Sequence, residues 1–210
     1  DWYLVGQTIR GTVDADYFFG KPVAGGTVAV AGSAWDVEFS TFASANGVTS
    51  AEGIFPFELK LPDYLVGQDL EQGKAVVRIT VIVTDTAGQQ VQKEFGLTVA
   101  GAPLLVSVIP ESGTPVAGVE NRFHVFSESP DGTPVQADVT VTISDSEGGT
   151  RDIELETDES GMGHFQFAVP GNGLSVNVEA TLGNGGKGYN EYVFKPGQSA
   201  GSLLVRTDRA

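Results

Sequence analysis

Residues 49–62 read TSAEGIFPFELKLP, and residues 157–170 read TDESGMGHFQFAVP. Threonine, glycine, phenylalanine and proline return in the second stretch at one constant offset (161 − 53 = 108 and 170 − 62 = 108). Upstream of each stretch, GKPV at 20–23 recurs as GTPV at 132–135, at an offset of 112 (132 − 20 = 112). A small loop insertion explains the difference between the two offsets. The sequence therefore predicts two copies of one module of roughly a hundred residues.

Both copies carry the alternation of apolar and polar residues that is typical of half-buried strands. In the quoted stretch, Phe57, Leu59 and Leu61 fall on one face of a strand, while Glu58 and Lys60 fall on the other. Similar segments recur along the chain, separated by Gly, Asp, Asn and Pro. The candidate strands are 9–17, 27–30, 55–61, 76–83 and 91–99 in the first copy, and 104–109, 122–127, 138–144, 150–156, 163–169, 175–182 and 189–194 in the second.

Strands at this spacing predict an all-β chain of two consecutive seven-stranded antiparallel β-sandwiches. The convincing periodicity is that of strands throughout, and one short helical turn is expected at 65–72. The repeated motifs are interpreted as turn chemistry. Glycine in GTPV and GKPV supplies a positive φ for a tight turn, and proline fixes the entry of the next strand.

Proline and glycine also mark the module boundaries. Pro103 biases its predecessor to an extended conformation, so the segment 100–103 is interpreted as the crossing between modules. The domains are therefore expected at 1–101 and 102–198, with 199–210 forming a second linker and the first strand of a following domain. Because both ends run straight into apolar segments, we expect the chain to be a piece of a longer protein. Short linkers predict restricted freedom between neighbouring modules.

Composition excludes several classes of function. The chain has 12 basic and 27 acidic residues and a net charge of −15, whereas nucleic-acid binding needs clustered Lys and Arg. It has no cysteine, which rules out disulfides, thiol catalysis and thiolate metal sites. No apolar run approaches the roughly twenty residues of a membrane helix. A solvated acidic surface that keeps a multi-domain protein soluble is the interpretation we favour.

The ordered motifs resemble those of the alpha-2-macroglobulin family. Residues 11–25, GTVDADYFFGKPVAG, are similar to the opening of that family's third macroglobulin domain. The stretch from Leu104 through NRF at 121–123, PDGTPV at 130–135 and TDESG at 157–161 resembles the fourth domain, and 203–210 is similar to the first strand of a following one. The resemblance covers nearly the whole chain. It implies macroglobulin or fibronectin III-like sandwiches.

The resemblance also implies a function. Members of the family are cages in which macroglobulin domains support a bait segment, and protease cleavage of the bait collapses the cage around the protease. In many members a Cys–Gln thioester in a separate domain then couples to the target. This chain departs from that pattern, because it has no cysteine and no long polar segment typical of a bait. The resemblance therefore implies a scaffold role.

Candidate catalytic groups are scattered in the sequence. His124 and His164 are the only histidines, and each stands alone in a strand pattern, so surface or packing roles are expected for both. Ser33 lies in Gly32-Ser33-Ala34, which lacks the second glycine of a nucleophile elbow. The acidic pairs Asp145–Glu147 and Asp158–Glu159 are interpreted as solvated turn residues.

Two further kinds of site have candidate residues in the sequence. Loop oxygens in 145–149 and at Asp131-Gly132 could ligate calcium, yet neither loop has the spacing that pre-organises a calcium site. Trp2 and Trp35 suit either a sugar platform or a domain interface, and the interface is favoured. We therefore expect no catalytic, cofactor-binding or metal-binding residues and no cofactor.

The sequence thus predicts a non-enzymatic scaffold fragment of a protease-trapping, endopeptidase-inhibiting protein that is extracellular, periplasmic or at the cell surface. Its expected partners are neighbouring macroglobulin domains of the same chain and, through the full-length protein, target proteases. Nucleic acid and a membrane span are not expected. The alternative is a pair of immunoglobulin-like or fibronectin-like modules of a bacterial surface adhesin or carbohydrate-active protein.

Overall fold

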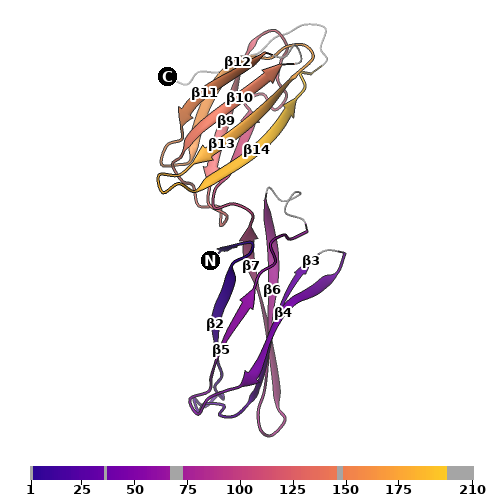
Figure 1. The fold of residues 1–210 in the computed structure, drawn as a ribbon, viewed down its shortest axis with the longest axis vertical. Coiled ribbons are helices and arrows are strands. Elements are labelled where there is room, and N and C mark those ends of the chain that lie inside the picture. Colours follow the sequence, from indigo (N-terminus) through magenta and orange to yellow (C-terminus); the bar gives the residue numbers. More distant parts are fainter. Residues whose placement is uncertain (1, 36, 67–72, 146–148, 198–210) are drawn as a thin grey trace. The chain divides into compact units, whose positions relative to one another are not determined.

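A computed structural model describes residues 2–35, 37–66, 73–145 and 149–197. The chain forms two compact units, Asp1–Gly101 and Ala102–Ala210 (Figure 1). Every described element is a strand, so the all-β expectation is confirmed. The expected strand at 199–210 lies outside the described residues, as does most of the expected helical turn at 65–72.

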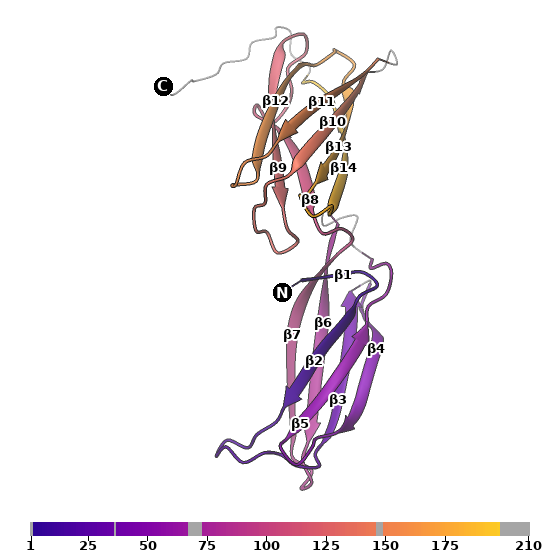
Figure 2. The same ribbon diagram turned by 60° about the vertical axis from the view of Figure 1, so that its left-hand side comes forward.

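The first unit is a sandwich of two sheets. Its strands are β1 (Trp2–Leu4), β2 (Thr8–Asp14), β3 (Thr27–Trp35), β4 (Phe39–Val48), β5 (Ile54–Lys60), β6 (Lys74–Thr84) and β7 (Gln90–Ala100). One sheet has the order β1-β7-β6-β3-β4, and the other consists of β2 and β5 (Figure 2). Between them lies a core of buried side chains that includes Ile9, Val30, Leu59, Val77 and Ile79.

The second unit is also a sandwich of two sheets, and its smaller sheet has three strands where that of the first unit has two. Its strands are β8 (Leu105–Pro110), β9 (Glu120–Glu128), β10 (Asp138–Asp145), β11 (Thr150–Glu156), β12 (Met162–Ala168), β13 (Leu174–Thr181) and β14 (Lys187–Phe194). The four-stranded sheet has the order β11-β10-β13-β14, and the three-stranded sheet has the order β12-β9-β8. Phe123 and Phe165 stack at the centre of its core, with ring centroids 5.0 Å apart.

Two features of the first unit differ from expectation. β1 pairs with β7 in parallel, from Trp2 opposite Thr98 to Leu4 opposite Ala100, so this sandwich is not wholly antiparallel. β4 was absent from the expected strands, because its residues are mostly small or polar and it forms the edge of its sheet. An edge strand needs fewer buried apolar side chains, so its alternation is weak.

The two repeated motifs meet in space, which explains why both recur. The Gly161 backbone N–H and C=O lie in a turn next to Ser127, whose N–H donates to Gly161 O at 2.8 Å. Gly161 has φ +69°, and a Cβ there would lie 2.3 Å from Ser127 O and 3.2 Å from Pro134 Cβ. Gly53 repeats this arrangement in the first unit, with φ +80° and a Cβ position 2.5 Å from Ala15 O. Only glycine fits so close an approach with a positive φ.

The motif threonines are buried and hydrogen-bonded. Thr157 has no exposed surface, and its Oγ1 lies 2.7 Å from Ser127 Oγ and accepts from Ala137 N–H at 2.9 Å. Thr49 occupies the same place in the first unit, where its Oγ1 accepts from Gly26 N–H at 2.9 Å. Each threonine thus satisfies a buried backbone donor that would otherwise cost stability. These contacts favour the structural interpretation of the motifs.

Candidate functional site

The two histidines lie opposite each other on neighbouring strands. His164 of β12 pairs with His124 of β9 in the antiparallel register. His164 is exposed and His124 is partly buried. This pairing could not be predicted from the sequence, because the residues are 40 positions apart (164 − 124 = 40) and meet only through the sheet register. Directly opposed side chains have Cβ atoms about 5 Å apart, close enough for two imidazoles to interact.

This histidine pair supplies at most two ligands from its own residues. Among the described residues, no group of three or more His, Cys, Asp or Glu side chains could hold a metal ion. A structural or catalytic zinc site needs three or four protein ligands. The geometry therefore corresponds to a surface pair of side chains and offers no enclosed metal centre.

Ser33 is not placed as a nucleophile. It lies on β3, where the register shifts between Gly32 and Ser33, and its Oγ is 3.3 Å from Thr41 Oγ1. A hydroxyl partner cannot accept the serine proton as a general base does. The arrangement is therefore an ordinary cross-strand hydroxyl contact.

The acidic turn residues accept backbone hydrogen bonds. Asp158 Oδ1 accepts from the N–H groups of Ser160 at 2.9 Å and Met162 at 3.0 Å, and Asp131 Oδ1 accepts from Thr133 N–H at 3.1 Å. These bonds stabilise the ionised carboxylates. The pKa of Asp158 is lowered, and the main cause is the hydrogen bond from the Ser160 side chain. The pKa of Asp131 is also lowered, mainly by the hydrogen bond from the Thr133 backbone. Residues 146–148 of the other candidate loop lie outside the described residues.

Trp35 and Phe39 of the first unit form an exposed aromatic patch on the five-stranded sheet. Trp35 is 56% exposed and packs edge-on against Phe39, with ring centroids 5.0 Å apart. The Arg78 guanidinium carbon lies 3.5 Å from the centre of the Phe39 ring, which is the geometry of a cation–π contact. Trp2 is partly buried on β1 and lies across Thr98 from the exposed Val76. Both tryptophans thus lie in the same five-stranded sheet.

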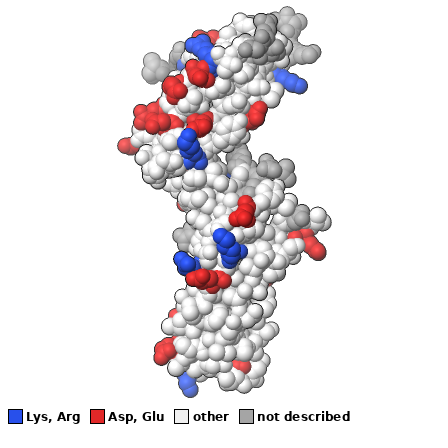
Figure 3. Space-filling model, in the orientation of Figure 1, with Lys and Arg blue, Asp and Glu red and all other residues white. Residues whose placement is uncertain are grey.

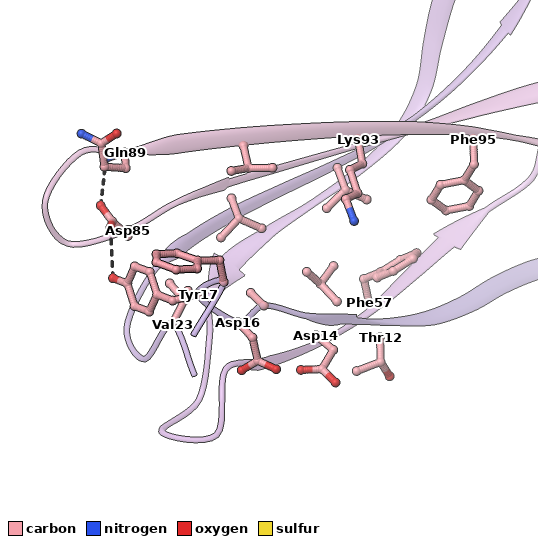
Figure 4. Close-up of a pocket in the computed structure, with 16 residues that line it drawn as sticks. Thr12, Asp14, Asp16, Tyr17, Val23, Phe57, Asp85, Gln89, Lys93 and Phe95 are labelled. Atoms are coloured by element: carbon pink, nitrogen blue, oxygen red, sulfur yellow. Dashed lines mark hydrogen bonds between the residues drawn. The ribbon is translucent and has the colours of Figure 1, made fainter. Parts of the chain in front are cut away.

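Sequence reasoning missed a groove between β2 and β7. Its volume is about 440 Å³, and its lining is mostly apolar (Figure 4). Phe57 of β5 and Phe95 of β7 point into the same space. The apolar lining residues are Val13, Val23, Phe57, Val81, Val83, Val91 and Phe95.

Polar groups line one end of the groove. Asp85 contributes a carboxylate, and Tyr17 Oη donates to Asp85 Oδ2 at 3.0 Å, whereas the Asp14 and Asp16 side chains point away from β7 (Figure 4). The Gln89 N–H, which also donates to Asp85, is the main cause of the lowered pKa of Asp85. The hydrogen bond to Asp85 in turn raises the pKa of Tyr17. Lys93 of β7, which lies between Val91 and Phe95, also points into the groove, so the lining combines apolar side chains with charged groups of both signs.

The loop between β2 and β3 has an aromatic tip. Phe18 is fully exposed and Phe19 is 62% exposed, and Tyr17 stacks on Phe19 with ring centroids 5.3 Å apart.

The face in Figure 3 shows scattered acidic and basic side chains separated by uncharged areas. Its charges do not gather into the basic stripe that nucleic-acid binding needs. Within the described ranges, no helix is long and apolar enough to cross a bilayer.

Comparison with protein-family models and with curated proteins finds no match. Solved structures do match in fold. The native conformation of Escherichia coli alpha-2-macroglobulin aligns with 100% of this chain at a TM-score of 0.50 and 15% identity. Trypsin-activated alpha-2-macroglobulin from the same organism aligns with 96% of it at a TM-score of 0.50 and 12% identity. In each case the chain covers 16% of the solved protein.

At this identity the likeness shows the fold alone. The macroglobulin-like β-sandwich fold implied by the motifs is confirmed. The chain spans about a sixth of the length of these two alpha-2-macroglobulin structures. What the larger proteins do therefore enters only as a proposal for this chain.

Proposed function

We propose that this chain is a non-catalytic scaffold of two macroglobulin-like modules within a larger protease-trapping protein. The observation that carries the proposal is the fold likeness to E. coli alpha-2-macroglobulin across the entire chain. The contacts of the candidate groups support it. Their serine, threonine and aspartate side chains hold turns and strands together. The scaffold would act outside the cytoplasm, in the periplasm, at the cell surface or in the medium.

The exposed aromatic patch is the proposed contact surface for a neighbouring module. Trp35, Phe39 and Val76 are 56%, 37% and 63% exposed, and large apolar side chains grouped at a surface are typical of protein interfaces. Tryptophan and arginine are also the residues that most often dominate binding energy. Target proteases would interact through the full-length protein, and this chain would transmit a rearrangement between modules.

The test uses the full-length protein and this chain side by side. The full-length protein should retain a protease after being cut by it, and the chain alone should leave protease activity unchanged. Trp35→Ala in the full-length protein should lower the fraction of protease retained without changing the rate of cleavage. Val48→Ala, at another exposed apolar residue of the same unit, is the matched control and should retain protease normally.

Two outcomes would contradict the scaffold function. Stoichiometric inhibition of a protease by the isolated chain would place an inhibitory site within it. A full-length protein that is neither cleaved nor able to retain protease, and instead binds surfaces or glycans, would support the adhesin alternative.

A further inference from the structure

The outer face of the three-stranded sheet in the second unit gathers the rarest side chains of the sequence. On β12, Phe165 packs in the core, so Met162 and His164 lie on the opposite, outer face. On the neighbouring strand β9, Phe123 is buried, so His124 lies on the same outer face (Figure 2). The chain has one methionine and two histidines, and all three therefore share one face of one sheet.

The two histidines form the closer type of cross-strand pair. Three positions along each strand from His124 and His164, the Ser127 N–H donates to Gly161 O at 2.8 Å (127 − 124 = 3 and 164 − 161 = 3). Hydrogen-bonded and non-hydrogen-bonded positions alternate along an antiparallel pair, so the histidines occupy a non-hydrogen-bonded position. At such a position the Cα atoms are only about 4.5 Å apart. Both imidazoles can therefore reach one metal ion.

Met162 is a neighbour of both histidines. It lies two residues from His164 on the same face of β12, about 7 Å along the strand. It pairs with Phe126, two residues from His124, which makes Met162 and His124 diagonal neighbours. Diagonal neighbours about 7–8 Å apart remain within reach of long side chains, and methionine is long and unbranched. Because Met162 is 42% exposed, its sulfur is not held in the core.

The two imidazoles are also available to a ligand. His164 is exposed and His124 is partly buried, so a metal ion can enter from solvent. Within the described ranges, no hydrogen bond from the protein engages either ring. The ring of His124 contacts Phe126, with centroids 6.4 Å apart. The nitrogens of both rings can therefore donate a lone pair to a metal.

The charge on this face favours a monovalent cation. Arg122 lies two residues from His124 on the same face of β9. Its Nη1 lies 3.9 Å from Oε1 of Glu111, which follows β8 on the side of β9 away from β12. Coulomb repulsion from the guanidinium is half as large for a cation of single charge as for a divalent one.

These features select the metal. A thioether is a soft ligand that favours Cu(I), and imidazole also suits copper. Zinc in proteins takes thiolate, imidazole or carboxylate ligands, and calcium and magnesium take oxygen. We propose that His124, His164 and Met162 form a three-coordinate Cu(I) site on the outer face of β9 and β12. The proposal departs from the absence of metal ligands expected from the sequence, and it does not depend on the proposed function.

The first test is a titration of the 210-residue chain with Cu(I), under reducing and oxygen-free conditions, in competition with the chromophoric chelator bicinchoninate. One Cu(I) should bind per chain. Met162→Leu, which keeps an apolar side chain, and His164→Gln should each weaken binding at least about tenfold, since even the loss of a group that orients a ligand costs that much. Gln166→Ala, at the next outer position of β12, is the matched control and should bind as the wild type does.

Two further measurements separate the thioether from the histidines. Met162→Leu should leave the affinity for Zn²⁺ unchanged, because zinc uses only the imidazoles. In protein labelled with ¹³C at the methionine methyl group, the Met162 signal, identified by its absence from Met162→Leu, should shift on addition of Cu(I). The shift should disappear when both histidines are replaced by Gln.

Three outcomes would overturn the proposal. The first is a Cu(I) affinity that is equal in Met162→Leu and the wild type, which would leave a site of two histidines alone. The second is a Met162 methyl signal that does not move at saturating Cu(I). The third is an equal loss of affinity in Gln166→Ala, which would mean that copper binds the surface without a defined set of ligands.

Discussion

At the scale of single residues, the repeated glycines are the strictest requirement of the fold. Gly161 combines φ +69° with a Cβ position 2.3 Å from a backbone oxygen, and backbone cannot move aside as a side chain can. Gly185 has a similar φ of +86° with no atom within 4 Å of its Cβ position. Comparing alanine substitutions at Gly161 and Gly185 therefore separates the free-energy cost of the positive φ from the cost of the clash with the backbone oxygen.

Gly161→Ala is expected to lower the free energy of unfolding by at least about 3 kcal/mol, since it adds a clash to the conformational penalty. Gly185→Ala should cost only about 1–2 kcal/mol, because the left-handed conformation is its sole penalty. Urea denaturation followed by circular dichroism measures both. Equal losses for the two variants would mean that the approach to Ser127 O does not constrain the turn.

Asp158 predicts a pH dependence of stability. Its folded-state pKa lies below the ordinary value of 3.8, mainly because the Ser160 side chain hydrogen-bonds to it. A carboxylate with a lowered folded-state pKa contributes stability above its unfolded pKa, and this is lost as pH falls through the folded value. Asp158→Asn should therefore destabilise the protein at pH 7 and flatten the loss of stability below about pH 4. Parallel pH profiles for the two proteins, measured by thermal melting, would count against this role.

At the scale of elements, β12 contributes a central aromatic side chain to the core of the second sandwich. Phe165 is 5% exposed and stacks on Phe123, so its removal leaves a cavity between the sheets. Phe165→Ala is expected to cost about 3–5 kcal/mol. Tyr189→Ala, at an aromatic residue that is 62% exposed in the same unit, should cost less than about 1 kcal/mol. A denaturant midpoint near that of the wild type for Phe165→Ala would show that the core lies elsewhere.

How far the elements could be predicted depends on their burial. Buried and more exposed residues alternate along strands of the second unit, and the sequence predicts the positions of these strands. In β8, for example, Val106, Val108 and Pro110 are buried and the residues between them are not. β4 escaped prediction because an edge strand of Ser, Ala, Thr and Gly hardly alternates. The parallel pairing of β1 was also beyond prediction, because it joins residues almost a hundred positions apart (98 − 2 = 96). Local patterns encode strands, whereas strand order is set by long-range packing.

The candidate sites follow the same rule. The roles of Asp131 and Asp158 in turns could be predicted, because an Asx turn is formed by neighbours in sequence. The pairing of His124 with His164 could not, because it depends on the register of two strands. The groove could not be predicted for a third reason, because its apolar lining residues have the sequence pattern of ordinary core residues. Only the structure shows that two of them, Val91 and Phe95, are largely exposed.

At the scale of the whole molecule, each unit has its own core. Buried side chains group into one cluster within residues 9–99 and another within 104–180. Domains with separate cores can unfold separately unless their interface is large and apolar. The chain offers a direct way to observe this, because both tryptophans lie in the first unit. Tryptophan fluorescence therefore reports the first unit, while circular dichroism reports the strands of both.

Phe165→Ala is expected to leave the fluorescence transition in urea unchanged and to shift part of the circular dichroism transition to lower denaturant. Changes in unfolding free energy at distant sites in separate units are additive to within about 0.5 kcal/mol, so the first unit should not respond. Phe57→Ala, the repeat-equivalent change in the first unit, should shift the fluorescence transition instead. If Phe165→Ala moved both transitions equally, the units would unfold as one cooperative body. The two copies would then depend on each other for stability, and the second sandwich could not be treated as an independent module.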